Sequence, residues 1–262
     1  GSNTIMLQIA AEALGVAPDA ILLVAGDTDR TRDAGKTSAS RQTFVSGNAA
    51  RLAAEDLRAK ILRAANAGPD ARIIPGRPLR VQDNGRKVAV TEALKGSGRF
   101  DPPATPLDAD GQGNPYASYA FAAQCALVRV DRELGTVRVE RIAAAHDVGR
   151  AINPQQVEGQ IHGGIAQGLG LALMEEFIPG RTENLHDYLI PTIGDIPPIE
   201  VILVESPDPI GPYGAKGVGE PALVATAPAI LAAIRMATGA EITRVPATPD
   251  RVRAAILAAR RT

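Results

Sequence analysis

The segment Pro154–Glu176 constrains the fold of this chain most strongly, because it combines a helical pattern with several glycines. Proline is typical of the first helical turn, and apolar residues follow Pro154 at helical spacing. The glycines of this segment are Gly159, Gly163, Gly164, Gly168 and Gly170. Each glycine inside a helix costs roughly 1 kcal/mol relative to alanine. We therefore expect another backbone or a ligand to pack closely against this helix.

The amino-acid composition agrees with close packing of this kind. Aromatic residues make up 3% of the 262 residues, Trp is absent, and the chain contains 26 Gly and 20 Pro. Hydrophobic residues make up 45% and charged residues 22%, which is ordinary for a folded chain and argues against disorder. The core must therefore consist of aliphatic and small side chains.

Charge and cysteine content exclude several classes of protein. Lys and Arg total 28 against 29 Asp and Glu, a net charge of −1 that gives no global reason to bind nucleic acid or an anionic membrane. The longest apolar run, Ala222–Ile234, contains Pro228 and falls short of the ~18 residues of a membrane span. A single cysteine, Cys125, excludes an internal disulfide framework, a Cys-rich zinc site and a self-contained iron–sulfur cluster. We expect a reducing compartment, the cytoplasm.

Apolar periodicity and turn residues predict the order of the elements. In the first part we expect a helix at Ile5–Leu14, a strand at Ala20–Val24, a polar loop at Gly26–Ser40, a helix at Gln42–Ala65 and a loop-rich region at Ile73–Gly113. In the second part we expect a hairpin of Tyr116–Val130 and Thr136–Ala145, a helix at Pro154–Glu176, a strand at Ile199–Val204, and helices at Pro221–Met236 and Pro249–Arg260.

This mixture of strands and helices, with one hairpin and no regular βαβ cycle, predicts an α+β fold with mixed sheets and packed helices. The proline-rich region suggests an internal boundary. We expect two subdomains, residues 1–110 and residues 111–262.

The loop Gly211–Glu220 is the sharpest local feature. Gly214, Gly217 and Gly219 allow positive φ and expose backbone N–H groups next to a helix that begins at Pro221. Glu220 lies where a side chain can point from the helix end toward a cleft. The alternative is an acidic residue that only favours the helix dipole.

The segment Gly35–Thr43 opens the long helix with several hydroxyls and two cations. This composition suits a phosphate or pyrophosphate at a helix N-terminus. Ordinary capping by Ser38 or Ser40 explains it equally well.

Other catalytic patterns are missing from the sequence. His146, His162 and His186 are scattered and form no pattern with metal-ligand spacing, so we expect no metal ligated directly by protein side chains. No Gly-x-Ser-x-Gly elbow accompanies them. Cys125 lies within a β-rich run and fits a core residue better than a nucleophile.

Six segments together resemble the molybdenum hydroxylases, the family of xanthine dehydrogenase and aldehyde oxidoreductase. In chain order they are GSNTIMLQIAAEALG (1–15), residues 26–47 with GKTSASRQTFVSG, HDVGRAINPQQVEGQIHGGIAQGLGLALMEEF (146–177), NLHDYLIPTIGD (184–195), GAKGVGEPALVATAP (214–228) and PATP (246–249). Each alone is weak, but all six in this order are highly specific.

The resemblance implies roles for individual residues. Glu220 matches the glutamate that acts as base toward the molybdenum-bound hydroxyl, and Gln156 matches the glutamine that hydrogen-bonds the metal's oxo ligand or the nearby pterin. Gly217 and Gly219 would let the chain approach the metal closely. The loop expected to hold the pterin phosphate, with Ala39 bordering the substrate, consists of Thr37, Ser38, Ala39, Ser40, Arg41, Gln42 and Thr43.

The resemblance covers only the C-terminal part of a subunit about three times as long. It implies a molybdenum–molybdopterin cofactor in the cytosine dinucleotide form, a partner that supplies the larger part of the molybdenum subunit, a [2Fe-2S] subunit and an FAD subunit. We expect the chain to be inactive alone, either as part of a naturally split subunit or as a piece of a longer chain.

The expected function is the hydroxylation of an N-heterocycle or aldehyde at an electrophilic carbon, with oxygen derived from water. Two alternatives remain: a non-catalytic binding or assembly protein that retains the fold, and a phosphate- or nucleotide-binding enzyme without molybdenum.

Overall fold

The computed structural model describes residues 1–260, and this part of the chain forms two compact units. The first unit consists of Gly1–Tyr119 and Ser206–Gly217, and the second consists of Ala120–Glu205 and the chain from Val218 onward. The domain boundary at residue 110 stays a prediction.

The first unit contains four helical segments and one sheet before the chain passes to the second unit. These elements are α1 (Ser2–Leu14), a 3-10 turn (Pro18–Ala20), a π-helical turn (Gln42–Ser46), α2 (Gly47–Ala64), β1 (Arg72–Ile74), β2 (Leu79–Asp83) and β3 (Arg86–Val90); a second 3-10 turn, Pro212–Gly214, lies in the returning segment. The two expected helices are confirmed, although the second begins with a π-helical turn. Its residues Ile61 and Leu62 pack with Ile73 and Val81 of the sheet.

One expectation for the first unit is wrong, and a second is incomplete. Residues Ala20–Val24 form no strand, because Pro18–Ala20 is a 3-10 turn and Leu22 is 88% exposed rather than buried in a sheet. The region Ile73–Gly113 is not simply loop-rich, since it contains most of the antiparallel sheet β1-β2-β3. Asn84 and Gly85 have φ angles of 46° and 79° and close a tight turn between β2 and β3. An Asn-Gly pair is the strongest local signal for such a hairpin.

The second unit is built on a mixed three-stranded sheet of order β4-β5-β6. Its elements are β4 (Ala122–Val130), β5 (Val137–Asp147), α3 (Pro154–Leu173), β6 (Ile199–Val204), α4 (Pro221–Val224), α5 (Thr226–Thr238) and α6 (Pro249–Ala259). The expected hairpin is confirmed: β4 and β5 are antiparallel, and Asp131 Oδ1 accepts the N–H groups of Glu133 and Leu134 in the turn. Strand β6 pairs in parallel with β5, and α3 lies between them in the chain.

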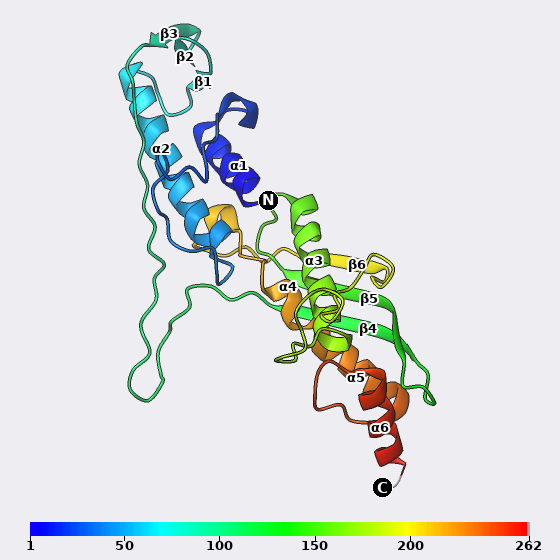
Figure 1. Cartoon of the computed structure of the whole chain (residues 1–262). Helices are drawn as coiled ribbons and strands as arrows, with labels where there is room; N and C mark the ends of the chain where they lie inside the picture. Colours follow the sequence, from blue (N-terminus) through cyan, green and yellow to red (C-terminus); the bar gives the residue numbers. More distant parts are fainter. Residues whose placement is uncertain (261–262) are drawn as a thin grey trace. The chain divides into compact units, whose positions relative to one another are not determined.

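The core of the second unit lies between the sheet and its helices (Figure 1). Residues Ile142 and Ala144 of β5 are buried against Ile161 and Ile165 of α3, and α5 contributes Ile230 and Ile234. These residues are aliphatic or small, as the composition predicted. The expected α+β fold is confirmed.

Several element boundaries differ from those expected. Strand β4 begins at Ala122 rather than Tyr116, and α3 ends at Leu173 rather than Glu176. The single helix expected at Pro221–Met236 is divided into α4 and α5, with Ala225 between them. Sequence patterns locate elements well but place their ends poorly, because caps and packing decide the last turn.

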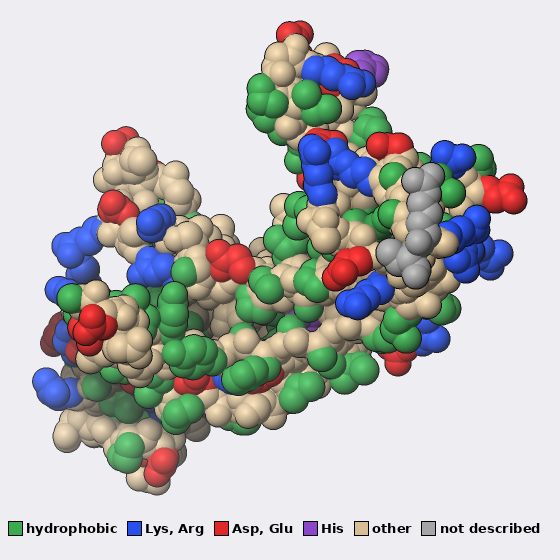
Figure 2. Space-filling view, turned by 90° about the horizontal axis from the view of Figure 1, so that it is seen from below, with side chains coloured by type: hydrophobic (Ala, Val, Ile, Leu, Met, Phe, Trp, Pro, Cys, Tyr) green, Lys and Arg blue, Asp and Glu red, His purple; other side chains and the backbone are tan. Residues whose placement is uncertain are grey.

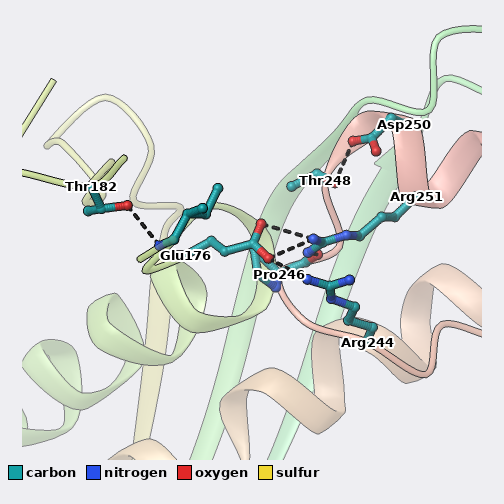
Figure 3. A network of polar contacts seen from close by, with 8 residues as sticks. Glu176, Thr182, Arg244, Pro246, Thr248, Asp250 and Arg251 are labelled. Carbon is teal, nitrogen blue, oxygen red and sulfur yellow. Dashed lines mark hydrogen bonds and ion pairs between the residues drawn. The ribbon is translucent and has the colours of Figure 1, made fainter. Parts of the chain in front are cut away.

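A network of charged side chains joins the segment after α3 to the start of α6 (Figure 3). The carboxylate of Glu176 accepts hydrogen bonds from Arg251 Nη2 at 2.7 and 2.9 Å and from Arg244 Nη2 at 2.9 Å. Arg251 Nη1 also donates to the carbonyl of Pro246 at 2.9 Å. The hydrogen bond from Arg251 lowers the pKa of Glu176. Glu176 therefore has a structural role within the second unit.

The segment Pro221–Thr238 is long and apolar enough to cross a membrane by length and composition alone. Core helices of globular proteins pass the same test, and Ala222, Ala227, Ile230 and Ile234 of this segment belong to the core of the second unit. Figure 2 shows Lys and Arg side chains interspersed with Asp and Glu over the face in view, in keeping with a net charge of −1.

Candidate functional site

The loop Thr37–Thr43 lies in the first unit and has an unusual backbone. Ala39 and Ser40 have φ angles of 56° and 50°, and the π-helical turn Gln42–Ser46 follows directly. Residues with a side chain in the left-handed region cost of order 1–3 kcal/mol each and cluster at ligand-binding sites. Short π-helical segments are also frequent at functional sites. Both features mark this loop as a candidate site.

Side chains of the loop hold it in this shape. Arg41 Nη1 donates to the carbonyls of Ala34 and Lys36 at 3.2 Å each, and Gln42 Nε2 donates to Thr37 Oγ1 at 2.5 Å. Arg41, the N-cap of the π-helical turn, makes no side-chain capping bond. Thr37 and Ala39 are exposed, whereas Ser38, Ser40 and Thr43 are half-buried.

Gly217 lies against this loop within the same unit. A Cβ atom built on Gly217 would lie 1.9 Å from the carbonyl oxygen of Ser40, so no other residue fits there without a backbone shift. The structure therefore brings together two site residues that are far apart in the sequence. It also supplies a reason for Gly217 within the chain itself.

Two buried polar residues anchor the segment before Gly217, and the sequence analysis missed both. Asn48 Nδ2 donates to the carbonyls of Phe44 and Ile210 at 2.9 and 2.8 Å. Asp208 Oδ1 accepts the N–H groups of Ile210 and Gly211 at 2.9 and 3.0 Å. No local pattern reveals the bond from Asn48 to Ile210, because the two residues are 162 positions apart. The two bonds to Asp208 are local, whereas its Oδ2 accepts from the distant Ser118 hydroxyl at 2.6 Å. Of the loop residues that follow, Tyr213 and Gly214 have positive φ.

Glu220 lies in the second unit, as the N-cap residue of α4. It is exposed, and its side chain makes no capping hydrogen bond to the helix. The acids near the end of α3 are half-buried and have structural partners: Glu175 accepts from the Tyr188 hydroxyl at 2.9 Å, and Glu176 binds Arg251 and Arg244. Of these three acids, Glu220 is the exposed one.

Gln156 lies in the first turn of α3. Its N–H donates to Asn153 Oδ1 at 3.2 Å, which caps the helix. Its side-chain Oε1 is buried and has no hydrogen-bond partner among residues 1–260. A buried polar atom without a partner is costly and calls for an explanation, such as a ligand.

Two glycines of α3, Gly159 and Gly163, share the helix face of Gln156, at spacings of three and seven residues. A Cβ atom at either position would meet no atom within 4 Å in the described chain. Nothing in the described residues therefore explains these two helix-weakening residues.

The two neighbouring glycines, Gly164 and Gly168, are explained by packing. A Cβ atom on Gly164 would lie 2.6 Å from the Cβ of Ala222, and one on Gly168 would lie 2.3 Å from the Cβ of Thr226. The expectation that another backbone packs closely against this helix is confirmed for α4 and the start of α5.

The sequence-predicted site residues thus fall into two groups. The first unit holds the loop Thr37–Thr43 together with Gly217, and the second unit holds Gln156, Gly219 and Glu220. His146 is buried, whereas His162 and His186 are exposed. Within residues 1–260, no group of three or more His, Cys, Asp or Glu side chains could hold a metal ion.

Comparison with known sequences gives one consistent picture. The profile of the molybdopterin cofactor-binding domain family matches residues 1–197. The putative xanthine dehydrogenase molybdenum-binding subunit of Escherichia coli (strain K12) is 34% identical over 96% of this chain and 35% of its own length. The aldehyde oxidoreductase of Megalodesulfovibrio gigas is 36% identical over 94% of this chain and 26% of its own. The chain thus spans about a third or less of these relatives.

Solved structures agree with the sequence comparison. The aldehyde oxidoreductase of Desulfovibrio gigas superposes with a TM-score of 0.82 at 34% identity, covering 97% of this chain and 27% of that one. Quinoline 2-oxidoreductase from Pseudomonas putida 86 gives a TM-score of 0.79 at 30% identity, covering 98% and 35%.

Proposed function

Because the chain belongs to the molybdopterin cofactor-binding domain family, we propose that it is part of the catalytic molybdenum subunit of a multi-subunit oxidoreductase. The enzyme would hydroxylate an N-heterocycle or an aldehyde at an electrophilic carbon, with oxygen derived from water. Both substrate classes are in keeping with the relatives, which include an aldehyde oxidoreductase and a 6-hydroxypseudooxynicotine dehydrogenase complex subunit.

One observation carries the proposal most directly, namely the open face of α3. The buried Oε1 of Gln156 has no partner within residues 1–260, and the two glycines on the same face have open space before them. A polar group with several donors, close to the helix backbone, satisfies both features. The residues present therefore fit a molybdopterin cofactor, which supplies the two-electron oxidation when bound.

In this proposal, different residues of the chain bind different parts of the cofactor. The loop Thr37–Thr43 holds the cofactor's phosphates, in the cytosine dinucleotide form, through hydroxyls and through backbone N–H groups at the helix start. The side-chain Oε1 of Gln156 accepts a hydrogen bond from the cofactor. Gly217 allows the close approach of the Ser40 backbone, and Gly217 and Gly219 would let the chain approach the metal closely.

Glu220 would act as the general base. A carboxylate oxygen of Glu220 accepts the proton of the attacking, water-derived hydroxyl, which makes that oxygen a stronger nucleophile toward the electrophilic carbon. The exposed position of Glu220 at the start of α4 supports this role.

The base assignment is tested in the complete enzyme that contains this chain. Glu220→Gln preserves size and shape but cannot accept the proton. We expect assembly and molybdenum content to survive, while anaerobic stopped-flow reduction by substrate slows by at least ~10²-fold. The control is Glu183→Gln, an exposed acid in the same unit, which should reduce at the wild-type rate. Wild-type reduction of the Glu220 variant would place the base elsewhere.

The phosphate loop is tested separately through cofactor retention. Ser40→Asp would place a negative charge in the loop proposed to hold phosphate, so we expect molybdenum occupancy to fall while the fold persists. Ser2→Asp, at an exposed helix start, is the matched control and should keep full occupancy. Metal analysis and circular dichroism measure both quantities. Equal occupancy in the two variants would contradict the loop assignment.

The alternative of a non-catalytic assembly protein predicts a purified complex without molybdenum. Metal analysis of the wild-type complex distinguishes the two. A cytoplasmic location and inactivity of this chain alone belong to the same proposal.

A further inference from the structure

The side-chain amide of Gln124, on β4, makes hydrogen bonds to other elements of the second unit through both its Nε2 and its Oε1. Its Nε2 lies 3.0 Å from the carbonyl oxygen of Ala222 and 3.3 Å from His146 Nε2, and its Oε1 accepts from the Thr226 hydroxyl at 2.8 Å. One half-buried side chain thus joins β4 to β5, to α4 and to the start of α5.

The partners determine which way the amide faces. The carbonyl of Ala222 can only accept, so the NH₂ group of Gln124 must point toward it. The second N–H of this group then points at His146 Nε2, which must accept. His146 is fully buried, and burial lowers its pKa, which favours the neutral imidazole. Because Nε2 accepts from the amide, the proton of the neutral ring lies on Nδ1. Every polar atom of the Gln124 amide therefore has a defined partner.

The residues bound by Gln124 are also held from the side of α3. Ala222 lies against Gly164 and Thr226 lies against Gly168, at distances that leave no space for a side chain on either glycine. Ala222 is the second residue after Glu220. The chain that follows Glu220 is therefore fixed both by packing on α3 and by hydrogen bonds from β4.

We propose that Gln124 is a positioning residue that holds Glu220 in place by binding the Ala222 carbonyl and the Thr226 hydroxyl. The inference rests on the proposed function, in which Glu220 is the base. Without the amide, the carbonyl of Ala222 and the hydroxyl of Thr226 lose their partner on β4, and α4 keeps its contacts with α3 and α5. Small displacements of a catalytic group lower the rate of the chemical step more than substrate binding.

The test uses the complete enzyme with Gln124→Met, which preserves side-chain length but cannot form the hydrogen bonds. We expect kcat to fall about tenfold with KM changed less than about twofold, and molybdenum content to stay constant. Backbone amides of residues 222–226 should exchange with deuterium faster, in the apo protein as well. Gln82→Met, on β2 of the first unit, is the control and should change none of these quantities.

A double variant separates positioning from a general structural effect. If Gln124 acts through Glu220, adding Gln124→Met to Glu220→Gln should lower kcat no further, although amide exchange at residues 222–226 still accelerates. A full tenfold loss in the Glu220→Gln background would overturn the inference, as would unchanged exchange in Gln124→Met. If Glu220→Gln alone kept the wild-type rate, the proposed function would fail first.

A second variant keeps the test decisive if Gln124→Met fails to assemble. Thr226→Val removes only the hydroxyl from which Gln124 Oε1 accepts a hydrogen bond. We therefore expect faster amide exchange at residues 222–226 and a smaller fall in kcat, about threefold. Wild-type exchange and kcat in this variant would overturn the inference.

Discussion

At the scale of single residues, buried polar groups determine how this chain responds to pH. His146 is fully buried, its Nδ1 has no hydrogen-bond partner within the described residues, and burial lowers its pKa. The unfolded chain therefore binds a proton at a higher pH than the folded chain does. The contribution of the buried, neutral His146 to the free energy of unfolding is complete above the unfolded pKa of about 6.5. This contribution is lost as the pH falls below that value.

This difference predicts a pH-dependent stability that one substitution removes. Wild-type protein should lose more unfolding free energy between pH 7.5 and pH 5.5 than the His146→Gln variant, measured by denaturant unfolding at each pH. His186→Gln is the matched control, because His186 is exposed, and its curve should parallel the wild type. Parallel curves for His146→Gln as well would contradict the role of burial.

At the scale of elements, the glycines of α3 are of two kinds: some pack against other elements of the chain, and others lie on an open face of the helix. Gly168 leaves space for Thr226, whereas Gly163 faces no atom within 4 Å. The two substitutions to alanine should therefore have opposite effects on the same helix. Only the first creates a clash, while both gain helix propensity.

We expect Gly168→Ala to lower the unfolding free energy of the apo protein by about 1–3 kcal/mol, because the added methyl group overpacks the contact. Gly163→Ala should raise it by up to about 1 kcal/mol. Denaturant unfolding without cofactor measures both, and each variant is the other's control. Equal effects would mean that the helix contacts are not those described.

The hairpin β2–β3 shows how far local sequence signals predict an element. Its Asn84-Gly85 turn was a recognisable signal, but the prolines nearby suggested only loops. The strand expected at Ala20–Val24 failed for the opposite reason, since an apolar run without a pairing strand is not a strand. Strand formation depends on a partner that a local window does not contain.

At the scale of the whole molecule, the chain spans 35% of the Escherichia coli relative and 26% of the Megalodesulfovibrio gigas relative. We predict that it works only in a complex with the larger part of a molybdenum subunit, a [2Fe-2S] subunit and an FAD subunit. The clusters need cysteines that a chain with one cysteine lacks.

Size-exclusion chromatography of protein from its native source, with metal and flavin analysis of each peak, measures this assembly. The activity should elute only with the partners, and the separated chain should show none. An active peak that contains this chain alone would contradict the prediction.

The sequence by itself determined the α+β class, the long helices, the β4–β5 hairpin and the family. Helical and strand periodicities are local properties, and six motifs in a fixed order identify a family even when each is weak. The sequence also singled out Glu220, Gln156 and the loop Thr37–Thr43, whose roles stay predictions.

Only the tertiary structure decided which residues hold these groups in place. Asn48 binds the carbonyl of Ile210, Asp208 accepts from the Ser118 hydroxyl, and Gln124 reaches Ala222 and Thr226, which are 98 and 102 residues further along the chain. The sequence predicted a close approach to the glycine helix, but not that Gly164 and Gly168 pack against the chain while Gly159 and Gly163 face open space. Buried polar groups and close backbone contacts take their partners from the fold, and sequence spacing carries no information about those partners.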